Sequence, residues 1–283
     1  MTPISIIYIL GAIIFGASSK ILSRYSAETT NVLGLAIFIQ FTAALIFLPS
    51  AIIHFSFPSN TTPLLALTLA SIVWAIIAVT SLNSHKHTPV SLREPISQLR
   101  AIVVFLLGIL LLGESWSGKA FFGTVLIALG ITIAIFHPER KFGNFKNRGV
   151  QLTILSSTIA AIAPIMDKFS LGFFDPNVYG FLVYFIPGLI LLSIPQPRRE
   201  NFKEVFKNKF WPAVGISVSS AISYFCILKT YLLLPVTIAY PILQTSSLVV
   251  VISGIVLLKE KNNLFFKIAG TIVTILGVIL LKQ

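Results

Sequence analysis

The sequence predicts an all-α polytopic membrane protein with ten transmembrane helices arranged as two inverted five-helix repeats. Three observations support this prediction. The mean hydropathy is +0.92, and only 11% of the 283 residues are charged, whereas a soluble domain carries about 25%. Ten apolar runs each approach the roughly 20 helical residues that cross the hydrocarbon core. One 26-residue stretch recurs in the second half of the chain.

Polar and turn-forming segments separate the apolar runs, as at 26–31, 58–63 and 137–148. No run alternates in the manner of a membrane strand, so a barrel is not expected. The gap at 196–209 mixes aromatic residues with lysines, which indicates a short interfacial helix. The first run follows no basic segment and therefore predicts a spanning helix, not a signal peptide. The expected spans are 3–22, 32–54, 64–84, 88–112, 118–137, 149–169, 176–196, 210–228, 236–258 and 264–281.

Residues 89–114, PVSLREPISQLRAIVVFLLGILLLGE, align without a gap with residues 235–260, PVTIAYPILQTSSLVVVISGIVLLKE, and 12 of 26 positions are identical. The chain is therefore divided into a first repeat at 1–137, a basic linker at 138–148 and a second repeat at 149–283. Because five is an odd number, the second repeat must enter the membrane in the opposite sense. Inverted repeats are typical of secondary transporters that bind their substrate near the midplane.

Pro95 and Pro241 occupy equivalent positions in the two repeats. Each is expected to kink its helix and to free the carbonyl four residues earlier. Paired helices interrupted by proline are the best sequence indication of a transporter's substrate site. Since the apolar run 101–112 is too short to span alone, the fourth helix must begin near Thr88. The charged residues between Thr88 and this run are therefore predicted to lie inside the membrane, facing protein or a water-filled cavity.

Lysine and arginine in the loops predict an orientation. They concentrate in the loops that follow the odd-numbered helices, whereas the opposite side holds only Lys119, Lys229 and Lys282. The positive-inside rule places the basic loops in the cytoplasm and both termini outside.

The two repeated helices end in Leu111-Leu-Gly-Glu114 and Leu257-Leu-Lys-Glu260, and glycine-containing helices follow at Gly123…Gly130 and Gly270…Gly277. Together with the ten spans in two halves, these residues resemble the EamA family of the drug/metabolite transporter superfamily over essentially the whole chain. The resemblance implies a multi-pass plasma (inner) membrane carrier that exports or imports a small metabolite by alternating access. The family usually keeps both termini in the cytoplasm, against the loop charges here. The glycines are expected to allow close helix packing.

An arginine's planar guanidinium suits carboxylates and phosphates, so the predicted cargo is an anionic or zwitterionic, amino-acid-like metabolite. Glu114 and Glu260 end their helices, and a role at the membrane boundary or as a gate is expected for them rather than contact with the substrate. Candidate substrate-binding residues, drawn from both repeats, are Arg93, Glu94, Ser97, Gln98, Arg100, Tyr240, Gln244, Trp74, Lys20 and Lys168.

Other interpretations remain open for these residues. Glu94 could pair with a neighbouring arginine, Lys20 and Lys168 could snorkel to the interface, and Lys168 could form a local ion pair with Asp167. The cargo would then be neutral and lipophilic, with structural arginines, or the chain would be a non-transporting assembly protein.

Several function classes are not expected. The sequence has no catalytic motif, Walker loop or acidic cluster for magnesium, so neither an enzyme nor a cofactor is predicted. The histidines of His85-Lys-His87 have no acidic or cysteine partner, so no metal site is predicted. The net charge of +12 lies in short loops between apolar runs, which favours membrane orientation over nucleic-acid binding. The expected partners are the lipid bilayer and a small-molecule substrate. One chain holds both repeats, so a monomer should be competent, although a homodimer stays open.

Overall fold

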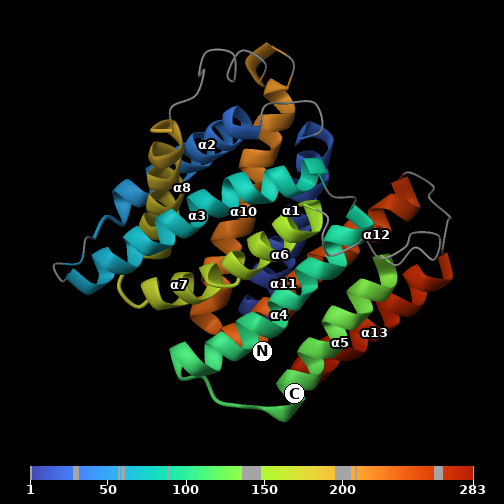
Figure 1. Ribbon diagram of the computed structural model, residues 1–283. Helices are drawn as coiled ribbons and strands as arrows, with labels where there is room; N and C mark the ends of the chain where they lie inside the picture. The colour runs from blue at the N-terminus through green and yellow to red at the C-terminus, as the bar shows by residue number, and fades with distance from the viewer. Residues whose placement is uncertain are drawn as a thin grey trace.

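The computed structural model describes residues 2–27, 32–56, 58, 61–87, 90–135, 148–194, 205–207, 209–257 and 264–282. Within these ranges the regular structure is entirely helical (Figure 1). The helices are α1 (Pro3–Ala27), α2 (Val32–Ile53), α3 (Thr61–His87), α4 (Val90–Leu112), α5 (Gly118–Ile135), α6 (Arg148–Ala160), α7 (Ala163–Ser170), α8 (Pro176–Leu192), α10 (Phe210–Leu233), α11 (Val236–Gln244), α12 (Ser246–Leu257) and α13 (Leu264–Lys282).

The all-helical class is confirmed, and a helix or a pair of helices occupies each predicted segment. The sixth segment is divided into α6 and α7, and the ninth into α11 and α12. Ten membrane spans in two inverted repeats stay a prediction. In the described part of the chain, five helices are long and apolar enough to cross a membrane. They lie at Pro3–Ser23, Val32–Ile53, Thr61–Thr80, Gly118–Ile135 and Phe210–Leu233.

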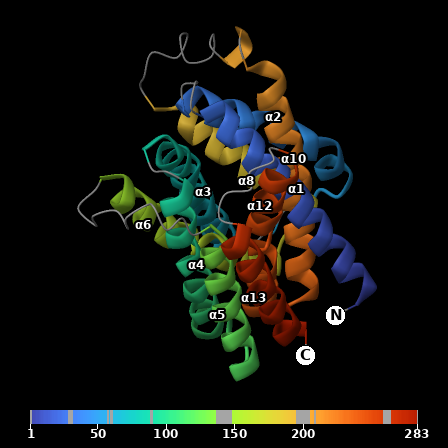
Figure 2. The same ribbon diagram turned by 90° about the vertical axis from the view of Figure 1, so that its right-hand side faces the viewer.

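Helices from the two halves of the chain pack in pairs. α1 packs on α10, α3 on α6, α2 on α8, α4 on α11, and α5 on α13. Figures 1 and 2 show two of these pairs, α2 with α8 and α5 with α13, running side by side. When the segments of the two halves are matched in order, α1 corresponds to α6, and α3 corresponds to α10. The pairs α1·α10 and α3·α6 are then equivalent, and each of the other three pairs joins two corresponding segments. The packing therefore agrees with the internal repeat in the sequence.

The pair α5·α13 confirms that its glycines allow close helix packing. A Cβ atom built on Gly277 would lie 2.7 Å from the backbone oxygen of Gly123, and one on Gly130 would lie 2.7 Å from the backbone oxygen of Gly270. Side chains at these positions would force the helices apart. Small residues allow backbones to approach in this way in membrane proteins, where apolar lipid provides no hydrophobic drive for association.

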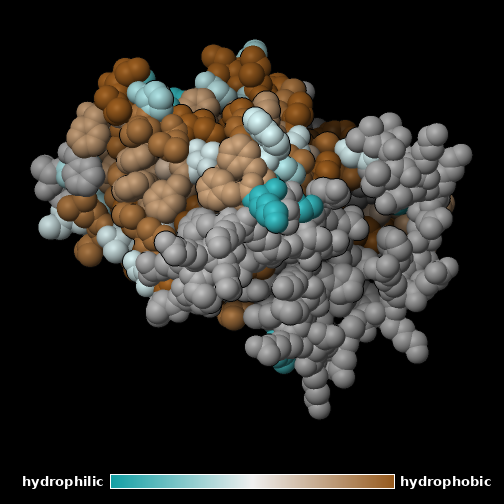
Figure 3. Space-filling view, turned by 90° about the horizontal axis from the view of Figure 1, so that it is seen from above, coloured by the Kyte–Doolittle hydropathy of each residue, from teal (hydrophilic) through white to brown (hydrophobic). Residues whose placement is uncertain are grey.

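Large apolar side chains cover much of the described surface. Ile7 and Ile14 of α1 are 67% and 55% exposed, and Phe265 of α13 is 76% exposed. In the end-on view of Figure 3, the described rim is mostly apolar. Such a surface fits contact with lipid rather than with water.

The interruptions near the two predicted kinks differ. α11 contains Pro241 and ends at Gln244, and α12 begins at Ser246. α4 is one helix through position 95, so the expected kink at Pro95 stays a prediction. Of the expected interfacial helix between 196 and 209, residues 205–207 are helical, and most of the remainder lies outside the described residues.

Candidate functional site

A cavity of about 180 Å³ lies among α1, α2, α3, α8 and α10. Both halves of the chain form it, with three helices from the first half and two from the second. None of the lining residues has a charged side chain. They are Ser19, Ser23, Ala36, Ile39, Gln40, Trp74, Ile77, Ala78, Val183, Tyr184, Ile216, Ser220 and Tyr224.

Three aromatic rings of the lining are in contact with one another. The ring of Tyr224 stands nearly perpendicular to that of Trp74, with centroids 5.5 Å apart, and to that of Tyr184, also at 5.5 Å. Edge-to-face contacts of this kind fix ring orientation. Among the polar lining residues, the hydroxyl oxygens of Ser19 and Ser220 are 3.2 Å apart and share a hydrogen bond.

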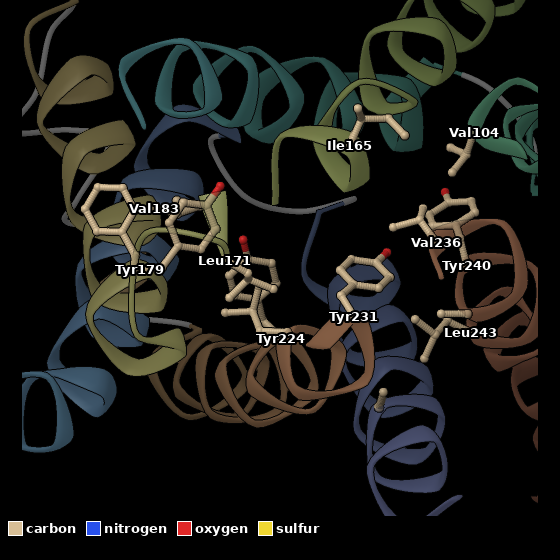
Figure 4. Close-up of a cluster of buried hydrophobic side chains, with 14 of the residues drawn as sticks. Val104, Ile165, Leu171, Tyr179, Val183, Tyr224, Tyr231, Val236, Tyr240 and Leu243 are labelled. Carbon is tan, nitrogen blue, oxygen red and sulfur yellow. The ribbon is translucent and has the colours of Figure 1, made fainter. Parts of the chain in front are cut away.

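Asp167 of α7 is bonded to the cavity wall. One carboxylate oxygen, Oδ1, accepts hydrogen bonds from Trp74 Nε1 at 3.2 Å, from the Tyr224 hydroxyl at 2.9 Å and from the Tyr179 hydroxyl at 3.0 Å. The side chain of Asp167 is only 2% exposed. Figure 4 shows Tyr179 and Tyr224 within the buried cluster, contributed by α8 and α10. Trp74 and Tyr224 also line the cavity, so two side chains connect it directly to the buried carboxylate.

Local sequence positions the partners of Asp167. Pro164 lies in the first turn of α7, where a missing N–H costs nothing and the fixed φ favours a helix start. Asp175 caps α8 by accepting a 2.8 Å hydrogen bond from the backbone N–H of Asn177, and Pro176 begins that helix. The cap fixes the first turn of α8, which carries Tyr179 toward Asp167.

Three predicted site residues from different repeats meet away from the cavity. The guanidinium carbon of Arg100 lies 5.7 Å from the centre of the Tyr240 ring, and Gln244 Nε2 donates to the Tyr240 hydroxyl. The buried atoms Arg100 Nε and Gln98 Oε1 have no hydrogen-bond partner within the described part of the chain. Ser97, one turn before Arg100, is half-buried. The cluster therefore keeps hydrogen-bonding capacity unused.

Two other predicted residues hold the junction between α10 and α11. The carboxylate of Glu114 accepts hydrogen bonds from the backbone N–H groups of Val236, at 2.7 Å, and Thr237, at 2.9 Å. Lys168 Nζ donates to the backbone oxygens of Tyr231 and Leu234. The carboxylate of Glu114 thus accepts from N–H groups at the start of α11, and the ammonium group of Lys168 donates to carbonyl oxygens at the end of α10. The helix dipole favours a negative charge at the start of a helix and a positive charge at its end.

The remaining predicted residues are distributed as follows. Lys20 Nζ donates to the hydroxyls of Ser246 and Ser247 on α12. Trp74 is the one predicted residue among those that line the described cavity. The side chains of Arg93, Glu94 and Pro95, and all of Glu260, lie outside the described residues, so their predicted roles stay predictions.

Asp167 was missed as a site residue, because its neighbour suggested a local ion pair. Lys168 Nζ instead bonds to backbone oxygens of α10 and the following turn, and in the described part of the chain Asp167 accepts only from Trp74, Tyr179 and Tyr224. The available signal was its position as the one acid in the apolar run 149–169, since ionisable residues inside a membrane usually serve function. The described residues contain no group of three His, Cys, Asp or Glu placed to hold a metal.

Comparisons with known proteins bear on both the family and the fold. Residues 147–282 match the model of the EamA-like transporter family. No curated protein sequence matches the chain. Among solved structures 28 chains match, and one crystal structure superposes with a TM-score of 0.75, covering 98% of this chain and 95% of that chain at 9% sequence identity. At this identity, the likeness shows the fold alone.

Proposed function

The chain belongs to the EamA-like transporter family, whose model matches residues 147–282, and from this premise we propose that it is a secondary transporter of a small organic solute. In this proposal the solute binds in the cavity among α1, α2, α3, α8 and α10 and crosses the plasma (inner) membrane by alternating access. The observation that carries the proposal is that helices from both halves build the cavity. A site between two packed halves can open to either side when one half rocks against the other.

The cavity suits a small, partly apolar solute. An engineered cavity of about 150 Å³ binds benzene, so 180 Å³ accommodates a molecule of similar or slightly larger size. Apolar and aromatic side chains form most of the wall, with Gln40 and three serines as polar points. Ligand sites of this type use the apolar wall for affinity and a few polar groups for orientation.

Binding in this cavity is tested by thermal unfolding of the purified protein against amino acids, carboxylates, phosphorylated metabolites, amines and neutral amphiphiles. A ligand that binds the folded state raises its stability by RT ln(1 + [L]/Kd), about 2.7 kcal/mol at 100 times Kd. Ala78→Phe fills the cavity from α3, whereas Leu65→Phe changes a 64% exposed side chain of the same helix.

The proposal expects at least one compound to stabilise the wild type and Leu65→Phe but not Ala78→Phe. Equal stabilisation of all three proteins would place the ligand elsewhere and overturn the assignment of the cavity. Uptake of the same compound into proteoliposomes then tests transport itself.

A second candidate site is the cluster around Arg100, which favours an anionic or zwitterionic cargo. Its support is the buried Arg100 Nε, which lacks a partner within the described residues, beside Tyr240 and Gln244. Here an anion should stabilise the wild type and Ala78→Phe but not Arg100→Ala. If anions stabilise none of these proteins, or stabilise Arg100→Ala as much as the wild type, the arginine is structural and the cargo is not recognised there.

A further inference from the structure

A buried carboxyl group, that of Asp167, is hydrogen-bonded to the wall of the cavity. The residues that line the cavity are uncharged, but Trp74 and Tyr224 both donate to the carboxylate of Asp167. Among the described residues, this carboxylate accepts hydrogen bonds from neutral groups only. All three donors bond to Oδ1, and none of them carries a positive charge that would balance an ionised carboxylate. In a surrounding of low dielectric constant such a charge acts strongly on neighbouring groups.

Two lysines that directly follow Asp167 or a cavity residue in the sequence bond to other groups. Lys168 follows Asp167, yet its Nζ donates to backbone oxygens at the end of α10. Lys20 follows the cavity residue Ser19, yet its Nζ donates to two serines of α12, none of whose residues line the cavity. The protein therefore does not neutralise Asp167 with either of these lysines.

The cavity also offers an acceptor that needs a donor. Gln40 is only 5% exposed and lines the cavity, and its Oε1 has no hydrogen-bond partner in the described ranges. The Tyr224 oxygen donates its proton to Asp167 and keeps its lone pairs, which the carboxylate makes more negative. Both atoms can accept from a ligand N–H.

Aromatic rings are the third group in the cavity that can bind a cation. Trp74, Tyr184 and Tyr224 all line the cavity, and rings of these types attract cations through their negative faces, more strongly when the cation is desolvated. An ammonium group supplies three donors and no acceptor. A ligand carboxylate would instead meet a buried negative charge and an acceptor oxygen, which disfavours it.

Resting on the proposed function, we infer that the cavity selects a solute with a cationic amino group, which it recognises through the Trp74, Tyr184 and Tyr224 rings, Gln40 Oε1 and the Asp167 carboxylate. In the cavity, the ammonium group lies on the other side of Trp74 and Tyr224 from Asp167. Its positive charge balances the negative charge of the carboxylate, while both side chains keep their hydrogen bonds to Asp167.

The test compares three probes of one size: benzylamine, benzyl alcohol and benzoate. Their binding to detergent-solubilised wild type is measured by thermal stabilisation and by calorimetry at neutral pH. The inference expects benzylamine to bind at least tenfold more tightly than the alcohol, and benzoate to bind more weakly than both. Asp167→Asn should reduce this preference for the amine over the alcohol to about threefold or less.

Asp175→Asn is the matched control, because it removes an acid close in sequence but keeps a residue type that caps α8 well. It should retain the full preference for the amine. If Asp167→Asn does not fold, the comparison of benzylamine with benzyl alcohol in the wild type still decides the outcome, because it needs no variant.

The outcomes separate the inference from the proposed function. If the probes bind the wild type but not Ala78→Phe and the amine is not preferred, the cavity is the solute site and the inference is overturned; Asp167 then holds a proton or is structural. If the preference for the amine survives in Asp167→Asn, the inference is also overturned. If no probe binds, or if all bind Ala78→Phe equally well, the assignment of the cavity itself fails.

Discussion

Asp167 shows how one buried side chain ties several helices together. Its Oδ1 accepts hydrogen bonds from Trp74 of α3, Tyr179 of α8 and Tyr224 of α10. Because hydrogen bonds to a charged group are stronger than those between neutral groups, each donor stabilises both the carboxylate and the packing of its own helix. The same contacts orient the two aromatic residues that face the cavity.

Tyr224→Phe tests this network at the residue scale. The change removes one donor from a charged, buried acceptor, so it should lower the free energy of unfolding by about 1.5–3 kcal/mol. Tyr8→Phe is the control: Tyr8 is half-buried and packs on Phe225, and its hydroxyl makes no hydrogen bond with the described residues. Both variants are compared by thermal and denaturant unfolding in the same detergent. Equal stability of the two variants would show that the hydroxyl of Tyr224 contributes nothing.

The site was only partly predictable from single residues. Trp74 was selected because it lies in the middle of an apolar run, and it does line the cavity. Tyr224 and Gln40 carry no comparable signal, because a span that is apolar on all sides does not reveal which face meets a partner helix. Asp167 was visible as an acid in a span, but the adjacent lysine offered a simpler explanation.

The junction between α10 and α11 shows how charged residues act on whole elements. Glu114 follows α4 in the first half of the chain, yet its carboxylate bonds to the first two N–H groups of α11 in the second half. Lys168 donates to the backbone oxygen of Tyr231 in the last turn of α10 and to that of Leu234, which follows the helix. The contact supports the prediction that Glu114 acts at a helix end, although a gating role stays a prediction.

Glu114→Ala should lower the free energy of unfolding by about 0.5–2 kcal/mol, as the loss of a helix cap does. Glu114→Gln should cost less, because one amide oxygen can still accept. Lys119→Ala changes an exposed charge a few residues away and is the control. Hydrogen exchange at Val236 and Thr237 should accelerate in Glu114→Ala, and unchanged exchange there would contradict the cap.

Close packing of α5 on α13 gives a second prediction at this scale. A Cβ atom on Gly270 would clash with the backbone of Ala134 and Gly130, so Gly270→Ala should cost about 1–3 kcal/mol, as overpacking does. Gly118→Ala is the control, because a Cβ there has no neighbour within 4 Å. Thermal unfolding that fails to distinguish the two variants would contradict the tight interface.

Element positions were well predicted, whereas their interruptions were not. Hydropathy located each helical segment, because apolar length is a strong signal. The breaks at 161–162 and at Thr245 lie inside continuous apolar runs, where composition does not change. The glycines of α5 and α13 were correctly read as packing positions because their spacing recurs in both halves.

At the scale of the whole molecule, helices of the first half pack on helices of the second half. α1 packs on α10 and α3 on α6, so neither half is a separate body. Helix ends Pro3 and Lys282 lie toward the same end of the bundle (Figures 1 and 2). An even number of spans produces this arrangement.

Orientation in the membrane is a prediction at the same scale. The loop charges place residues 138–148 in the cytoplasm and both termini outside, whereas the resemblance to the EamA family implies cytoplasmic termini. Reporter fusions at the C-terminus distinguish these cases, with alkaline phosphatase active only outside and a fluorescent protein only inside. The charge count predicts an active phosphatase, and a fluorescent cytoplasmic reporter would contradict it.

The most direct test of the central claim is the accessibility of the cavity from each side of the membrane. Ser220 lines the cavity, and the chain has a single native cysteine, Cys226. Ser220→Cys in a Cys226→Ser background is therefore labelled with a membrane-impermeant thiol reagent, applied to one side of the membrane or the other. A carrier that works by alternating access predicts labelling from both sides, with rates that a bound solute shifts in opposite directions. Labelling from one side alone, unchanged by every solute that binds, would contradict the account.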